Sequence, residues 1–234
     1  HFLYVGRAFS GPLLAQARAE ASALTPWASV VVGPSADTRV QHRFRLGVSG
    51  VEALTGVVNV ALGQLCKAWP GYVVREGHAF VVQGGEQVQH SHLDWHDHLG
   101  GGPAADSLAV FVPLSAAGRL FGLQAGSGLQ VVQLEAGSLA VLSTGAYHCG
   151  VGQQGELNPA LCFFVDRASG VGGSASAGSV SSILWEDLAQ EDRAAYCCRE
   201  SRVLGWCGLV RQLGLCFREG PAARRRRRYL QAGQ

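Results

Sequence analysis

Four of the eight histidines of this 234-residue chain lie within nine residues, in the segment QHSHLDWHDH (89–98). Imidazole nitrogens and carboxylate oxygens bind divalent metals, and an HxD motif brings together one of each, His92 and Asp94. Side chains two residues apart on a strand share a face, so His90 joins them if a strand extends over all three. His148, in a later strand-like segment, is the expected further ligand. His92, Asp94 and His148 would form the two-histidine, one-carboxylate arrangement that favours non-haem Fe(II) and leaves coordination positions open.

The alternative is a solvated histidine-rich loop, because an isolated HxD motif is more often accidental than functional. Three features favour a metal site. The motif follows a strand-like segment, His148 lies in a strand-like segment flanked by glycines, and the 56 positions from His92 to His148 leave room for several strands. We therefore predict that His92, Asp94 and His148 are metal ligands and, in an enzyme, the catalytic residues.

Short apolar segments separated by Gly, Ser or Pro dominate residues 72–166, where nine of them follow one another. Their spacing leaves no room for crossover helices, so the sheets must be mostly antiparallel, as in a double-sheet jelly roll. Residues 11–23 and 51–69 have patterns typical of helices, which would cover one face of the roll. Further strands are expected at 1–5, 27–32 and 42–47.

The expected fold class is therefore mainly β (α+β), a double-stranded β-helix with N-terminal supporting helices. The expected jelly-roll domain covers residues 1–167. A Gly/Ser/Ala-rich linker follows at 168–180, and residues 181–234 form a helical and Arg-rich tail, with a helix expected over 182–198.

The net charge of +2 hides an uneven distribution. Residues 193–234 contain ten arginines and two glutamates, a local charge of +8, so residues 1–192 carry −6. Contact with nucleic acid or another polyanion is expected only through the run from Arg224 to Arg228, for which a solvated tail is the favoured alternative. Hydrophobic residues make up 47% of the chain and charged residues 15%, which excludes disorder over its whole length. No apolar stretch reaches 18 residues, so no membrane span is expected.

The seven cysteines form an odd set without a CxxC pair. This pattern disfavours a zinc ribbon or a thioredoxin-type site, and it favours a reducing compartment over a secreted disulfide framework. The expected location is intracellular, in the cytoplasm or an organelle.

Several segments together resemble the Fe(II)/2-oxoglutarate-dependent dioxygenase superfamily, in particular its phytanoyl-CoA hydroxylase-like and prolyl hydroxylase-like branches. They are QVQHSHLDW, SLAVFVPL, GSLAVLSTGAYHCG and ALCFFVD, within a resemblance that covers about residues 11–166. The resemblance implies Fe(II) held by His92, Asp94 and His148, and 2-oxoglutarate as co-substrate. It also brings ascorbate into consideration as a reductant. The implied reaction is an O₂-driven hydroxylation or related oxidation of a small molecule or a protein side chain.

The sequence departs from this family about ten residues after the distal histidine. The family usually places an Arg or Lys there, to pair with the far carboxylate of 2-oxoglutarate, but this chain has Asn158 and Pro159. A planar guanidinium binds a carboxylate through two hydrogen bonds. Arg119 and Arg167 are the two candidate replacements, and surface arginines are the alternative for both.

Two other functions stay open. A cupin-type metal enzyme or small-molecule binder would use His90, His92, Asp97 and His148, although Asp97 stands where that family has Glu. A catalytically inactive jelly-roll binding module would keep the fold without the chemistry, and the missing cation near Asn158 supports this alternative.

Overall fold

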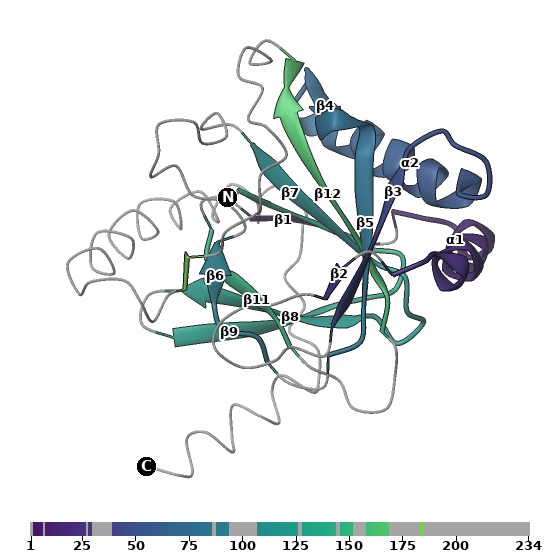
Figure 1. The fold of residues 1–234 in the computed structure, drawn as a ribbon. Coiled ribbons are helices and arrows are strands. Elements are labelled where there is room, and N and C mark those ends of the chain that lie inside the picture. The colour runs from purple at the N-terminus through teal and green to yellow at the C-terminus, as the bar shows by residue number, and fades with distance from the viewer. Residues whose placement is uncertain are drawn as a thin grey trace.

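The computed structural model describes ten ranges of the chain, and every structural statement below refers to them. They are residues 2–6, 8–26, 28–29, 39–85, 88–93, 107–125, 128–143, 146–151, 158–168 and 183–184. Two antiparallel sheets face each other, and two helices lie against one of them (Figure 1). The mainly β architecture predicted from the short apolar segments is confirmed for this part of the chain.

The larger sheet has eight strands in the order β1-β10-β7-β12-β5-β3-β2, with β4 also paired to β12. Every pairing in it is antiparallel. Its strands are β1 (Phe2–Val5), β2 (Ala28–Ser29), β3 (Val40–Arg45), β4 (Tyr72–Val74), β5 (His78–Gln83), β7 (Leu108–Pro113), β10 (Leu139–Ser143) and β12 (Ala160–Arg167). A short 3-10 turn, η1 (Arg75–Gly77), joins β4 to β5.

The smaller sheet has five strands in the order β13-β6-β11-β8-β9, and these pairings are antiparallel too. Its strands are β6 (His92–Leu93), β8 (Arg119–Ala125), β9 (Gly128–Leu134), β11 (His148–Gly150) and β13 (Ile183–Leu184). From β7 to β12 the chain crosses between the two sheets in the manner of a jelly roll, with β8 and β9 as a consecutive pair in the smaller sheet.

Helices α1 (Gly11–Ala23) and α2 (Glu52–Ala68) cover the outer face of the larger sheet (Figure 1). Both confirm the helices expected from the sequence. Apolar residues at helical spacing, among them Leu54, Val58 and Leu65, pack against Leu161, Phe163 and Val165 of β12 in the main core. Each fully buried Leu or Val contributes roughly 1.5–3 kcal/mol to stability.

The carboxylate of Glu20, on α1, caps the N-terminus of α2. Its two oxygens accept hydrogen bonds of 2.9 Å and 2.8 Å from the backbone N–H groups of Ala53 and Leu54. The first N–H groups of a helix have no partner within the helix and carry partial positive charge, so a carboxylate stabilises them. This contact fixes the two helices to each other on the outside of the roll.

The second core cluster fills the space between the two sheets. Its buried members come from both sheets and include Ala109, Phe121, Leu134, Ala140 and Leu142. Successive side chains of β12 point to opposite faces of the sheet and so belong to different core clusters. Phe163 and Val165 point to the helices, whereas Phe164 packs against the inner cluster. The inner faces of the sheets thus form the interior in which the predicted site residues must meet.

Two elements differ from the sequence-based expectation. Of the described residues 88–93 in the strand expected over QVQHSHLDW, His92 and Leu93 form a strand and residues 88–91 do not. The helix expected from residue 182 is wrong at Ile183 and Leu184, which form β13 beside β6. The proposed linker, apart from its first residue Ala168, and the Arg224–Arg228 run lie outside the described residues.

None of the helices within the described ranges is long and apolar enough to cross a bilayer.

Candidate metal site

His92 and His148 lie side by side on neighbouring strands of the smaller sheet. They are register partners in the pairing of β6 with β11. Their ring centroids are 4.9 Å apart, with an interplanar angle of 46°. Both residues are only 4% exposed. The fold therefore brings together two of the three predicted ligands, which are far apart in the sequence.

The same type of hydrogen bond holds both rings. Nδ1 of His92 lies 2.7 Å from the carbonyl oxygen of His90, and Nδ1 of His148 lies 3.0 Å from that of Ala146. Because a carbonyl oxygen only accepts, Nδ1 carries the proton in each of these hydrogen bonds, so Nε2 is the nitrogen with the lone pair in the neutral tautomer. Metal-binding histidines are commonly oriented by a hydrogen bond from the other ring nitrogen. These residues thus fit a divalent metal bound at the two Nε2 atoms.

Aromatic rings surround His148 in the interior of the roll. Phe121 of β8 stacks on its ring at a centroid distance of 5.4 Å and an angle of 15°. Phe111 of β7, from the opposite sheet, meets the same ring edge-on at 5.5 Å. The two phenylalanines are 5.0 Å apart. These contacts restrict the orientation of the imidazole and create apolar surroundings, in which electrostatic interactions are stronger than in water.

The carboxylate ligand of the predicted triad, Asp94, lies outside the described residues, two positions after His92. Its role as third ligand therefore stays a prediction. The same holds for Asp97 of the cupin alternative.

His90 is described, and its carbonyl oxygen orients His92. Within the described ranges no three His, Cys, Asp or Glu side chains are grouped so that they could hold a metal. His90, His92 and His148 are all described, so the three-histidine cluster that the cupin alternative needs is not formed. The physical reason is the short β6: the two-residue alternation that would put His90 and His92 on one face does not extend back to residue 90.

Arg119 points into the space between the sheets. Alternation along β8 puts it on the same face as Phe121, and it is only 7% exposed. Its Nη1 donates hydrogen bonds to two carbonyl oxygens of the larger sheet region, to Asn158 at 3.0 Å and to Val82 at 3.3 Å. A guanidinium from the smaller sheet thus reaches the position where the family resemblance implies a cation.

Arg167, the other candidate cation, is not brought to this interior. It is exposed at the end of β12, with its guanidinium carbon 5.6 Å from the ring centroid of Tyr72. Tyr72 and Val165 belong to the core under the helices, and Arg167 shares their side of the sheet. Its suggested role beside Arg119 is therefore wrong on geometric grounds.

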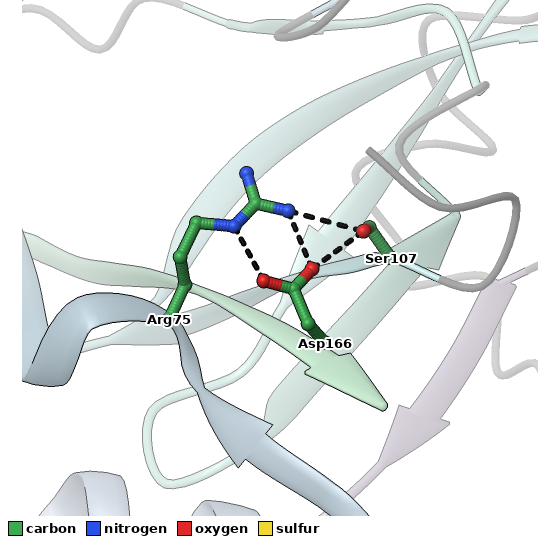
Figure 2. A network of polar contacts seen from close by, with 3 residues as sticks. All are labelled: Arg75, Ser107 and Asp166. Carbon is green, nitrogen blue, oxygen red and sulfur yellow. Dashed lines mark hydrogen bonds and ion pairs between the residues drawn. The ribbon is translucent and has the colours of Figure 1, made fainter. Parts of the chain in front are cut away.

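A polar network that the sequence did not suggest lies at the C-terminal end of β12, around Asp166. Arg75 of η1 donates hydrogen bonds to both carboxylate oxygens of Asp166, at 2.6 Å from Nε and 2.5 Å from Nη2, and to Oγ of Ser107 at 3.0 Å (Figure 2). Ser107 donates to the same carboxylate. Burial raises the pKa of Asp166, but the hydrogen bonds from Arg75 and Ser107 outweigh it, so this pKa lies below its usual value. The network ties η1, β7 and β12 together.

Sequence reasoning also missed Arg39 and Gln89, which contact β11 two residues beyond His148. Arg39 lies between the strands expected at 27–32 and 42–47, and Gln89 immediately precedes the histidine cluster. The one signal in the sequence was Gly150, two residues after His148, because a position without a side chain leaves room for both contacts.

Solved structures with known activities share this fold. A Pseudomonas putida prolyl-4-hydroxylase aligns with a TM-score of 0.51 at 16% identity, over 71% of this chain and 92% of that one. HygX from Streptomyces hygroscopicus, with nickel and 2-oxoglutarate bound, aligns with a TM-score of 0.52 at 15% identity, over 80% and 94%. A prolyl hydroxylase in complex with a hypoxia inducible factor oxygen degradation domain peptide fragment, from Trichoplax adhaerens, gives 0.50 at 11%, over 70% and 81%. No family model and no curated protein matches the sequence.

These likenesses establish the fold class. The chain has the double-stranded β-helix fold of the 2-oxoglutarate- and iron-dependent oxygenases, as the resemblance of its motifs implied. The facing histidines occupy neighbouring strands of that fold.

Proposed function

We propose that this protein is an Fe(II)- and 2-oxoglutarate-dependent oxygenase that hydroxylates or otherwise oxidises its substrate. One observation carries the proposal: His92 and His148 are adjacent, and both use Nδ1 to donate to a backbone carbonyl, so Nε2 is the ring nitrogen that would bind a metal in each. The fold shared with a prolyl-4-hydroxylase and with HygX supports it.

His92, Asp94 and His148 are the proposed ligands. Bound Fe(II) together with 2-oxoglutarate supplies the oxidising power for an O₂-driven hydroxylation. The carbonyl oxygens of His90 and Ala146 orient the two imidazoles through Nδ1. Phe111 and Phe121 exclude water from the side of His148 that faces the interior.

Arg119 is the proposed partner of the far carboxylate of 2-oxoglutarate. Its guanidinium is buried between the sheets and anchored through Nη1 to the carbonyl oxygens of Val82 and Asn158. Such anchoring fixes the plane of the fork, and a fixed planar fork binds a carboxylate with directional hydrogen bonds. Because the fork would be set in place before the anion arrives, little side-chain entropy is lost on binding.

The substrate class is proposed only in outline, as a small molecule or a protein side chain. One structural relative holds a peptide fragment, and that fact concerns the relative. Jelly-roll enzymes select substrates through loops, and the same fold supports many reactions.

A catalytically inactive binding module is the second candidate. The specific observation in its favour is Asn158, a buried residue with a φ of 38° that replaces the usual cation of the family. The two candidates differ in one respect: only the oxygenase converts 2-oxoglutarate.

The test is Fe(II)-dependent formation of succinate from 2-oxoglutarate by the full chain under air. Succinate is expected above the metal-free control, and Asp94→Ala and His148→Ala should abolish it. Thermal denaturation of the variants controls for folding. Succinate no higher than the metal-free control at saturating Fe(II) would overturn the oxygenase and favour the inactive module.

A further inference from the structure

A pair of buried polar side chains, Arg39 and Gln89, joins the two segments that carry the facing histidines. Gln89 precedes His92 by three residues, and Gly150 follows His148 by two. The backbone N–H of Gln89 donates to the carbonyl oxygen of Gly150 at 2.9 Å, and the N–H of Gly150 donates to Oε1 of Gln89 at 2.8 Å. Gln89 therefore binds both the backbone N–H and the backbone carbonyl of Gly150.

Arg39 adds a contact from the other sheet. It precedes β3 of the larger sheet and is 1% exposed, and its Nη2 donates to the same Gly150 carbonyl oxygen at 3.1 Å. The Gly150 carbonyl therefore accepts hydrogen bonds from both Gln89 and Arg39. A charged donor strengthens this arrangement, and its burial prevents water from competing for the oxygen.

Two glycines make space for this arrangement. A Cβ at Gly150 would lie 2.7 Å from Oε1 of Gln89 and 3.2 Å from Nε and Nη2 of Arg39. A Cβ at Gly85, whose φ is +97°, would lie 2.5 Å from Cζ and Nε of Arg39. The guanidinium lies so close to these two backbones that a side chain at either glycine would overlap it.

The register between β6 and β11 shows what the contact does. His92 pairs with His148, so a regular antiparallel ladder would bring residue 90 opposite Gly150. Gln89 occupies that place instead, so the segment before His92 contains one extra residue, as in a β-bulge. The extra residue lets the carbonyl oxygen of His90 turn toward Nδ1 of His92. A bulge of this kind re-aims a neighbouring side chain.

We propose that Gln89 and Arg39 are positioning residues, which hold the bulge against β11 and thereby set the relative placement of the His92 and His148 Nε2 atoms for the metal. This inference rests on the proposed metal site. It assigns a function to two residues outside the ligand set, whose only effect on the metal is through the backbone segments that they fix.

The experiment measures Mn(II) affinity of the full chain by the loss of the free-ion electron paramagnetic resonance signal, well below the unfolding temperature. Gln89→Met keeps the size of the side chain but lacks the acceptor, so it should weaken Mn(II) binding about tenfold or more. Gln89→Glu keeps an acceptor oxygen beside Arg39 and should bind within a few-fold of the wild type. Arg39→Lys should weaken binding, and it carries the test if Gln89→Met does not fold.

Ser107→Ala is the matched structural control. Ser107 is buried and hydrogen-bonded to Asp166 at the C-terminal end of β12, so its loss should lower the unfolding temperature without changing Mn(II) affinity. Equal Mn(II) affinity of Gln89→Met, Arg39→Lys and the wild type would overturn the positioning role while leaving the metal site intact. A wild type that binds no Mn(II) would overturn the metal site and the positioning role together.

Discussion

Nη1 of Arg119 donates a 3.0 Å hydrogen bond to the carbonyl oxygen of Asn158, the residue that stands where the resemblance of the sequence motifs implies a cation. The two residues are 39 positions apart and come from opposite sides of the roll. A cation missing from the sequence position is therefore present next to it in space. Under the proposed function, the departure at Asn158 concerns which strand supplies the charge that would pair with 2-oxoglutarate.

Exchanging Arg119 for glutamine tests whether β8 supplies the cation that binds 2-oxoglutarate. Arg119→Gln should raise the KM for 2-oxoglutarate by tenfold or more, because a charge-assisted hydrogen bond of about 1.5–3 kcal/mol is lost. Affinity for Mn(II) alone should stay near the wild-type value. Arg167→Gln is the matched control, since that guanidinium packs on Tyr72 outside the roll. Equal KM values for the two variants would contradict the assignment of Arg119.

The Arg75–Asp166 pair should show its contribution in the acid range. The pKa of Asp166 is lowered in the folded protein, so its stabilisation is complete above the usual carboxyl pKa of about 4 and is lost as the pH falls through the lower folded-state value. Asp166→Asn should reduce the free energy of unfolding at pH 7 by about 1–2 kcal/mol. Denaturant unfolding from pH 7 to pH 2 should show the two proteins converging below about pH 4. A constant difference over this range would argue against the ion pair.

A close contact between β8 and β11 makes Gly122 sensitive to substitution. A Cβ at Gly122 would lie 2.5 Å from Sγ of Cys149, its register partner, and 3.1 Å from Cδ1 of Leu129. Gly122→Ala should therefore destabilise the protein by about 1–3 kcal/mol. Adding Cys149→Ala removes the sulfur and should recover part of that loss, with a coupling of about 1 kcal/mol in a double-mutant cycle. Strictly additive effects would be inconsistent with this packing.

The pairing of β13 with β6 should support the metal site, because β6 carries His92. Leu184 pairs with His92, and Ile183 pairs with Leu93. In an antiparallel pair only alternate N–H groups point to the neighbouring strand, and proline removes that donor. One of Ile183→Pro and Leu184→Pro should therefore weaken Mn(II) binding several-fold, and the other should be tolerated. If both variants bind like the wild type, the pairing with β6 does not support the metal site.

The helices and the antiparallel sheets could be predicted because local patterns determine them. The apolar residues of α2 recur at helical spacing, and the short segments after residue 72 leave no length for crossovers. His92 and His148 could also be paired in advance, since each lies in a strand-like segment of one roll. In each case, the pattern that identifies the helix or strand lies within that segment of the sequence.

The arrangement around the histidines could not be predicted, because long-range contacts produce it. Arg39 reaches Gly150 across 111 positions, and no pattern near residue 39 distinguishes it from a loop arginine. The bulge before His92 depends on the side chain of Gln89, and it separates His90 from the ligand face. Arg119 and Arg167 look alike in sequence, and only the alternation of two different strands sends one inward and the other outward.

The central claim is that one divalent metal binds between His92 and His148 with Asp94 as the third ligand. The most direct measurement is anaerobic Mn(II) titration of the full chain, followed by the loss of the free-ion signal. The proposal predicts one Mn(II) per chain, binding that is lost in His148→Ala and Asp94→Ala, and binding that is retained in His90→Ala, which separates this ligand set from that of a cupin. Absence of stoichiometric binding by the wild type, or loss of binding in His90→Ala with retention in Asp94→Ala, would contradict it.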